Sequence, residues 1–297
     1  MGKRGPYRHR TLEERLKVHM EVMELRAGGK TVREIAEALG ISRRDVSYWF
    51  RVGKPSRTVY SPDLTPRDEL AYLVGAYLGD GRTAGEQDKK VRFKVADPAF
   101  ADQLNDLVSR VIGASRKPVT LEEGFSCVSY DAAVLYDFLQ QPIDAFASLI
   151  SSHSCAFLRG FFDAEGFASP VLNHGTRQFN GIEIGVANTN DDYLKLAQHL
   201  LRELGMSSRL VTTHETGEPM TIRGRTFFRQ REVHQVRLEG KTNVLLFFST
   251  VGFTIPKKKE KLSDMIEIMN GKSPSAGYVE FTSMYELVNR RWQRSLK

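Results

Sequence analysis

The pattern of apolar and polar residues along the chain contains one internal repeat. Residues 73–81 (LVGAYLGDG) and 158–166 (LRGFFDAEG) are both apolar runs, and each ends in a carboxylate followed by glycine. Small residues lie four apart on one face of each run, although a glycine inside a helix costs about 1 kcal/mol relative to alanine. Such a face lets two helix backbones approach closely. The repeat therefore predicts two buried helices packed on each other. The alternative is two unrelated buried helices, each ended by a glycine cap, but the acid at the same place in both runs favours the repeat.

A series of shorter elements follows each predicted helix. Alternation of polar and apolar residues predicts a strand at 91–95, and core spacing predicts a helix at 98–112. The remaining elements, read in the same way, are a hairpin at 119–128, a helix at 132–139, a strand at 182–186, a helix at 192–204, a strand at 208–212, a long arginine-rich hairpin and a strand at 233–238. Residues 251–259 end in three lysines and lead into a further helix.

A small helical unit precedes the repeat. Thr31 and Glu34, three residues apart, predict a capping box at the start of a helix. Ala36, Gly40 and Val46 occupy the small, turn and core positions of a helix-turn-helix. The exposed face of the second helix is expected to carry Arg43, Arg44, Ser47 and Arg51. This face is suited to the base edges and phosphates of DNA. The alternative is a basic three-helix domain that binds protein or nothing.

Proline, glycine, serine and threonine mark the expected boundaries between domains. In order, the expected parts are a helix-turn-helix domain (1–57), a linker (58–66), a first repeat (67–150), a second repeat (151–271) and a basic helical tail (272–297). Thr65 is the expected N-cap of the first motif helix. Residues 270–277 are expected to form a flexible break, and residues 281–296 an amphipathic helix.

The charge of the chain is concentrated at one end. The 297 residues carry a formal net charge of +7. Residues 1–60 hold 14 lysines and arginines against 7 aspartates and glutamates, and the remaining residues hold 29 of each. A basic module attached to a neutral body suggests an anionic partner. No apolar run reaches the roughly 20 residues that span a bilayer, and the N-terminus lacks the apolar core of a signal peptide. We therefore expect an intracellular protein that acts on DNA and has no membrane contact. The two cysteines fit neither a disulfide framework nor a zinc site.

The repeat also predicts a metal site. If the two motif helices pack through their small faces, Asp80 and Glu165 emerge side by side at the end of the pair. Two carboxylates forced together repel each other unless a cation lies between them. Magnesium takes carboxylate oxygens, backbone carbonyls and water as ligands. The expected ligands are the two carboxylates and the backbone carbonyls of Gly79 and Ala164, holding two or more Mg²⁺ ions, for which Mn²⁺ can substitute.

The paired runs resemble the LAGLIDADG motif of homing endonucleases, in the single-chain form that carries two copies. The resemblance covers roughly residues 66–265. It implies an α+β fold in which two pseudo-symmetric αββαββα repeats form a saddle, preceded here by the helix-turn-helix domain. The concave face of such a saddle lies on the major groove of DNA, which accommodates a β-ribbon or curved sheet.

The resemblance also implies roles for individual residues near the scissile phosphates. The polar side chains that orient water in this family align with Asp97 and Asn188. The lysine that neutralises the charge developing on the phosphate aligns with Lys257, and a shift of one or two residues in the alignment would place it at Lys258 or Lys259. The corresponding first-repeat segment, residues 143–148, has no lysine. This departure favours unequal cleavage of the two strands. The lysines can also be interpreted as the solvated start of a helix.

Basic side chains on the expected strands and hairpins complete the predicted DNA contacts. They are Arg92, Lys94, Arg223, Arg225, Arg229, Arg231 and Arg237. A solvated sheet face is the alternative interpretation for any one of them.

The resemblance implies a magnesium-dependent, site-specific endonuclease of double-stranded DNA, acting as a monomer and encoded within an intron. Two alternatives stay open: a DNA-binding transcriptional regulator on the same fold with little or no catalysis, and an intron RNA maturase.

Overall fold

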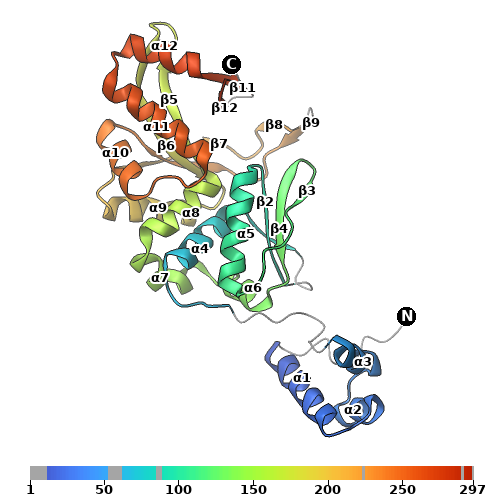
Figure 1. The fold of residues 1–297 in the computed structure, drawn as a ribbon. Coiled ribbons are helices and arrows are strands. Elements are labelled where there is room, and N and C mark those ends of the chain that lie inside the picture. Colours follow the sequence, from blue (N-terminus) through green and yellow to red (C-terminus); the bar gives the residue numbers. More distant parts are fainter. Residues whose placement is uncertain (1–11, 53–61, 85–88, 223–224, 289–290, 296–297) are drawn as a thin grey trace.

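The structure is a computed structural model that describes residues 12–52, 62–84, 89–222, 225–288 and 291–295 (Figure 1). Three helices form an N-terminal unit with its own apolar core, and the other described elements share a second, larger core. None of the described helices has the length and apolar character needed to cross a bilayer.

The N-terminal unit consists of α1 (Leu12–Ala27), α2 (Val32–Leu39) and α3 (Arg43–Val52). The capping box predicted for Thr31 and Glu34 is present at the start of α2. Gly40 ends that helix in the left-handed region, at φ 63°, where a residue with a Cβ atom would be strained. Val46 and Trp49 of α3 are fully buried. The local signals in the sequence thus gave the correct helices and turn.

The first repeat has the predicted order αββαββα. Its elements are α4 (Asp68–Asp80), β1 (Gly81–Ala84), β2 (Lys90–Val95), α5 (Pro98–Ile112), β3 (Thr120–Glu122), β4 (Phe125–Tyr130) and α6 (Ala133–Leu139). The strands form an antiparallel sheet in the order β1-β2-β4-β3. A 3₁₀ turn (Ile143–Phe146) and α7 (Ala147–Ser152) lead to the second repeat.

The second repeat has the same order of elements, with one hairpin inserted. Its elements are α8 (Ser154–Glu165), β5 (Gly166–Asn173), β6 (Gln178–Asn188), α9 (Asp191–Glu203), β7 (Arg209–His214), the inserted strands β8 (Pro219–Ile222) and β9 (Arg225–Phe228), β10 (Val233–Leu238), α10 (Lys241–Thr250) and α11 (Pro256–Gly271). The main sheet has the order β5-β6-β10-β7, which repeats the topology of the first sheet. The α+β fold with two αββαββα repeats is therefore confirmed.

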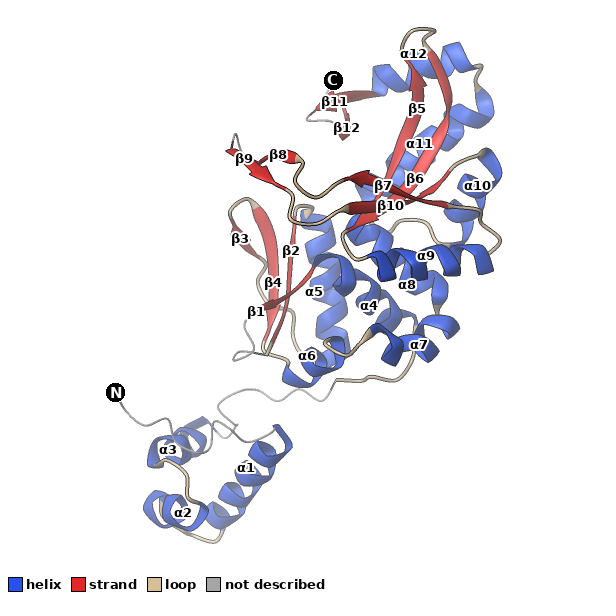
Figure 2. Cartoon of the chain, turned by 180° about the vertical axis from the view of Figure 1, so that it is seen from behind, coloured by secondary structure: helices blue, strands red, loops and turns tan. Residues whose placement is uncertain are grey.

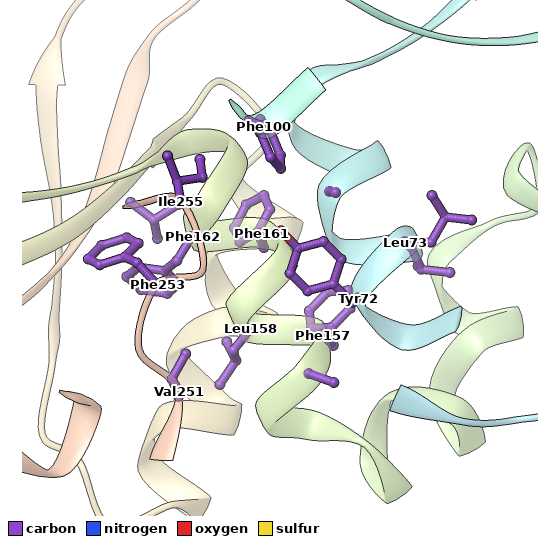
Figure 3. Packing of buried hydrophobic residues seen from close by; sticks show 14 of the residues in the cluster. Tyr72, Leu73, Phe100, Phe157, Leu158, Phe161, Phe162, Val251, Phe253 and Ile255 are labelled. Carbon is purple, nitrogen blue, oxygen red and sulfur yellow. The ribbon is translucent and has the colours of Figure 1, made fainter. Parts of the chain in front are cut away.

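Helices α4 and α8 cross at the centre of the molecule through their small residues. A Cβ atom on Gly75 would lie 2.2 Å from the carbonyl oxygen of Phe157, and one on Gly160 would lie 2.1 Å from that of Tyr72. Both distances are far below van der Waals contact, so only glycine permits this approach. Figure 3 shows Tyr72 and Leu73 of α4 packed with the phenylalanines of α8. The predicted helix contact is confirmed.

The sheets flank this helix pair, and the helices of each repeat cover one face of its sheet (Figure 2). In β2, Val91, Phe93 and Val95 point into the core while the alternate residues are half-buried. In β6, Ile182, Ile184 and Val186 are buried in the same way. Each sheet therefore has a second face that the core does not use.

Three sequence predictions at element boundaries are wrong. Arg67, whose side chain makes no capping hydrogen bond, is the N-cap of α4, and Thr65 lies two residues earlier. The expected break at 270–277 and the expected tail helix at 281–296 are replaced by α12 (Pro274–Met284), capped by Ser273, and a hairpin of β11 (Tyr285–Val288) and β12 (Arg291–Arg294). Phe281 is fully buried in the large core, so this segment is part of the body.

Candidate active site

The two motif helices end in the acids Asp80 and Glu165, beside the last contact between the helices. A Cβ atom on Gly79 would lie 2.5 Å from the Cβ of Ala164 and 2.9 Å from the Cγ of Glu165. The side chain of Glu165 therefore lies against the residue that precedes Asp80. The predicted convergence of the two acids at one end of the helix pair agrees with this geometry.

The electrostatics of Glu165 reflect both burial and its acidic neighbour. Burial, and after it the negative charge of Asp80, raise the pKa of Glu165 to about 7, while the positive charge of Lys258 acts in the opposite direction. Burial and the charge of Asp80 both disfavour a second negative charge at this position. A bound cation would relieve both of them.

Asn188 lies at the end of β6, next to Glu165. Its Nδ2 lies 3.4 Å from Oε1 of Glu165, and its Oδ1 accepts a hydrogen bond of 2.8 Å from the backbone N–H of Asn190. The second bond fixes the orientation of the amide. Asn188 was assigned to this site by resemblance, and the fold brings it there.

Asp97 occupies the matching place in the first repeat, between β2 and α5. Its carboxylate caps α5 by accepting hydrogen bonds from the backbone N–H groups of Ala99 and Phe100, at 2.9 and 3.3 Å. Its charge also reaches Lys258, whose pKa it acts to raise. Asp97 therefore has a structural role and lies within electrostatic range of the site.

Of the three lysines that the resemblance allows, Lys258 is the one that lies beside the acids. Its Nζ donates hydrogen bonds of 3.1 Å to the carbonyl of Phe162 and 2.6 Å to that of Asp163, whereas Lys257 is exposed. Burial lowers the pKa of Lys258 to about 8, although Asp163, Asp80, Glu165 and Asp97 all act to raise it. Because α11 begins at Pro256, the helical phase directs its third residue, Lys258, inward and leaves Lys257 exposed, which favours Lys258 among the three lysines that the resemblance allows.

A buried carboxylate that the sequence analysis did not identify holds this lysine segment in place. Asp163 is 1% exposed. It accepts hydrogen bonds from the hydroxyl of Tyr72 at 2.7 Å, from the backbone N–H of Thr254 at 3.1 Å and from the hydroxyl of Thr254. Gln103 of α5 donates to the Thr254 hydroxyl at 2.8 Å. The network joins α4, α5, α8 and the start of α11. Burial raises the pKa of Asp163.

The first repeat lacks both parts of this arrangement. The motif position of Asp163 is occupied by Leu78, and the segment matching the lysine-bearing loop, residues 143–148, has no lysine. That segment forms the 3₁₀ turn and the first residues of α7. The two halves of the site are therefore unlike each other, and the lysine ammonium comes from the second repeat alone among these segments.

The predicted DNA contacts on the sheets occur in several environments. Arg92 and Lys94 lie on the face of β2 away from the core, and Arg237 lies on the corresponding face of β10. Arg229 is half-buried and Arg231 is exposed after the β8–β9 hairpin. Arg223 lies outside the described residues, as does the side chain of Arg225.

In the N-terminal unit, the predicted recognition face is exposed. Arg44, Ser47 and Arg51 are exposed on α3. Arg43 pairs with Glu37 of α2 at 3.2 Å. All four predicted side chains are thus exposed to solvent, and Arg43 also makes a surface ion pair.

The donor atoms at the helix ends fit a hard divalent cation. The site offers carboxylate oxygens from Asp80 and Glu165, which are ligands that Mg²⁺ and Ca²⁺ prefer. Among the residues that the structure describes, no group of three or more histidine, cysteine, aspartate or glutamate side chains forms a ready metal cage. Mg²⁺ is commonly held by one or two carboxylates together with water and substrate phosphates, so two acids are a sufficient protein contribution.

Comparison with known proteins gives one family match and two curated relatives. Residues 152–252 match the family described as LAGLIDADG-like domain. The uncharacterized protein MJ0398 of Methanocaldococcus jannaschii is 26% identical over 245 residues, which cover 80% of this chain and 86% of that protein. Glutamine–fructose-6-phosphate aminotransferase (isomerizing) of the same organism is 21% identical over 220 residues, which cover 70% of this chain and 18% of that protein.

Solved structures are also similar at low sequence identity, and two of them illustrate the likeness. The crystal structure of I-DmoI in complex with DNA and Mn is 15% identical, with 62% of this chain and 96% of that chain covered and a TM-score of 0.45. Full-length DUF199/WhiA from Thermatoga maritima is 13% identical, with 75% and 67% covered and a TM-score of 0.45. The resemblance expected from the paired motifs is confirmed by the family match, in which residues 152–252 are similar to the LAGLIDADG-like domain.

Proposed function

We propose that this protein is a metal-dependent, site-specific endonuclease of double-stranded DNA. The observation that carries the proposal is the position of Glu165, packed against Gly79 at the end of α4 and electrostatically coupled to Asp80 and to Lys258. Two acids and a lysine at the contact of two duplicated helices form a site of the kind that phosphodiester hydrolysis requires.

The residues of the chain have distinct roles in this proposal. Asp80 and Glu165, with the carbonyls of Gly79 and Ala164, hold Mg²⁺, which supplies activation of water and stabilisation of the leaving oxygen when bound. Asn188 orients water beside Glu165, and Asp97 has the corresponding role in the first repeat. The ammonium of Lys258 neutralises negative charge that develops on the phosphate.

The unlike halves of the site predict unequal cleavage of the two strands. Only the second repeat places a buried ammonium next to the acids, among the residues that the structure describes. The strand whose scissile phosphate lies nearer to Lys258 is therefore cut faster, and nicked duplex accumulates before linear product.

DNA contacts outside the site come from the sheets, the inserted hairpin and the N-terminal unit. Residues 219–231 hold four arginines and no acidic residue, and Phe227 and Phe228 on β9 are 46% and 63% exposed. Exposed aromatic rings among arginines are suited to contact with nucleic-acid bases and phosphates. The exposed face of α3 adds affinity beside the central site. We propose that the protein acts on DNA as a monomer inside the cell.

The test uses Asp80→Asn and Glu165→Gln in the full chain. Each substitution keeps the size of the side chain and removes a negative charge, so cleavage in Mg²⁺ is lost while binding in Ca²⁺ is retained. Glu203→Gln on α9 is the matched control and cleaves like the original protein. The DNA is a library of fragments from the neighbourhood of the gene. Undiminished cleavage by both site variants would refute the proposal.

A second candidate, a DNA-binding regulator without catalysis, is favoured by the first repeat. One half of the proposed site lacks two polar groups that the other half has, because Leu78 stands where the second repeat has an acid and residues 143–148 contain no lysine. In the same assay this candidate predicts shifted fragments and no cleavage at any Mg²⁺ or Mn²⁺ concentration.

A further inference from the structure

The open faces of both sheets carry cations that are paired with carboxylates of the same face. On the first sheet, Arg92 pairs with Glu122 of β3, and Lys94 pairs with Glu123 of the following turn at 2.7 Å. The residues of β2 that point the other way, Val91, Phe93 and Val95, are buried. The paired groups therefore lie on the face that the core does not use.

The second sheet repeats the arrangement. Arg237 of β10 pairs with Glu183 of β6 at 3.3 Å, and Arg209 of β7 pairs with Glu239 directly after β10. Arg237 and Arg209 are directly opposite each other across the strand pair, so they share a face. Lys90, on the same face of β2 as Arg92, likewise pairs with Asp131 at 3.6 Å. Each of these cations on the described open faces is thus matched by a carboxylate.

This pairing agrees with the distribution of charge along the chain. Residues 61–297 hold as many acidic as basic residues, and the whole excess of +7 lies in residues 1–60. A surface that binds DNA of any sequence through the phosphates needs cations that are not paired with carboxylates, because this sequence-independent affinity comes from the release of counterions. The two sheet faces do not have this character.

We propose that the carboxylates of these pairs, Glu122, Glu123, Glu183 and Glu239, are specificity-determining residues that suppress binding of the sheet faces to non-target DNA. They neutralise the cations and hold them at fixed positions; the side chain of Lys94 is only 17% exposed. A phosphate that approaches such a cation also meets a carboxylate. A DNA sequence binds well only where its base edges replace that carboxylate as acceptors, as guanine does for arginine.

The two parts of the chain then contribute differently to DNA binding. The basic N-terminal unit supplies general, salt-dependent affinity, and the neutral sheets supply discrimination. This inference rests on the proposed action on DNA and holds for a nuclease and for a regulator alike.

The experiment measures binding of the full chain to a random-sequence duplex by fluorescence anisotropy over a series of salt concentrations. Two variants remove carboxylates from the sheet faces, Glu122→Gln/Glu123→Gln and Glu183→Gln/Glu239→Gln. The control, Glu203→Gln/Glu267→Gln, makes the same change in net charge on the exposed sides of α9 and α11. Circular dichroism confirms that each variant is folded, and the first pair, on an exposed turn, is the one least able to disturb folding.

We expect each sheet variant to bind the random duplex about tenfold more tightly at low salt, with a slope of log K against log salt steeper by about one to two, because each freed cation contributes about 0.9 to that slope. The control pair stays close to the original protein. If the first sheet pair and the control behave alike, the inference is overturned while binding to DNA stands. If the original protein fails to bind DNA at low salt, the proposed function fails first.

Discussion

The ammonium of Lys258 lies 2.6 Å from the backbone carbonyl of Asp163, two residues before Glu165. The bond ties the first turn of α11 to the last turn of α8, so the lysine and the acid of the second repeat are held in one rigid unit. The same residue, Asp163, binds the loop before α11 through its side chain. The backbone and the side chain of Asp163 thus both fix the position of the Lys258 ammonium.

Lys258→Met should reduce cleavage by about a hundredfold, because a preorganised charge in a buried site contributes strongly to stabilising the transition state. Lys257→Met, one residue away and exposed, should cleave like the original protein. Single-turnover rates at saturating Mg²⁺ measure both. Equal losses in the two variants would show that the ammonium acts only through general attraction of DNA.

Asp163→Asn should lower the free energy of unfolding by about 1–3 kcal/mol, because the amide leaves donors from Tyr72 and Thr254 without an acceptor. Asp144→Asn, an exposed aspartate on the 3₁₀ turn, should change it by less than about 0.5 kcal/mol. Urea denaturation measures the difference. The cleavage loss of Asp163→Asn combined with Lys258→Met should be smaller than the sum of the separate losses, because one residue acts through the other.

Gly75→Ala or Gly160→Ala should destabilise the protein by about 1–3 kcal/mol, since an added methyl group would lie against backbone atoms that cannot move independently. Helix propensity acts in the opposite direction by about 1 kcal/mol. Gly271→Ala at the end of α11 is the control, because nothing lies within 4 Å of its added Cβ atom. Thermal unfolding compares the three. A stabilised Gly75 variant would contradict the close helix contact.

Phe281→Ala should cost about 3–5 kcal/mol of stability, the usual effect of removing a buried phenylalanine. Val279, two residues earlier on α12, is 64% exposed, and Val279→Ala should be near neutral. The comparison tests whether the C-terminal segment belongs to the core. A small effect at Phe281 would mean that this segment is a dispensable appendage.

The sequence predicted the elements whose signals are local or duplicated. Glycine spacing in the two motifs predicted the helix contact at Gly75 and Gly160, because no other residue type permits that approach. The capping box at Thr31 and the alternation around Phe93 specify a helix start and a strand without reference to the rest of the chain. The convergence of Asp80 and Glu165 followed from the duplication.

The features that were missed depend on distant partners or on helical phase. Asp163 was not recognised because its importance comes from Tyr72 and Gln103, which are remote in sequence. The sequence could not choose among Lys257, Lys258 and Lys259, because the start of α11 decides which lysine turns inward. Residues 285–294 were interpreted as helical because their apolar residues suit an amphipathic helix as well as a hairpin, and contact of Tyr285 with Phe281 decides between the two.

Because both repeats lie in one polypeptide, each can change in sequence without the same change in the other. A homodimer would carry every substitution twice and would match inverted sequences, whereas here Leu78 and Asp163 have diverged at equivalent motif positions. The two repeats differ in their strands as well: among the described residues, the second repeat has an inserted hairpin and the first does not. A duplex that fits two such unlike surfaces is not palindromic, and a search for the natural target must not assume an inverted repeat.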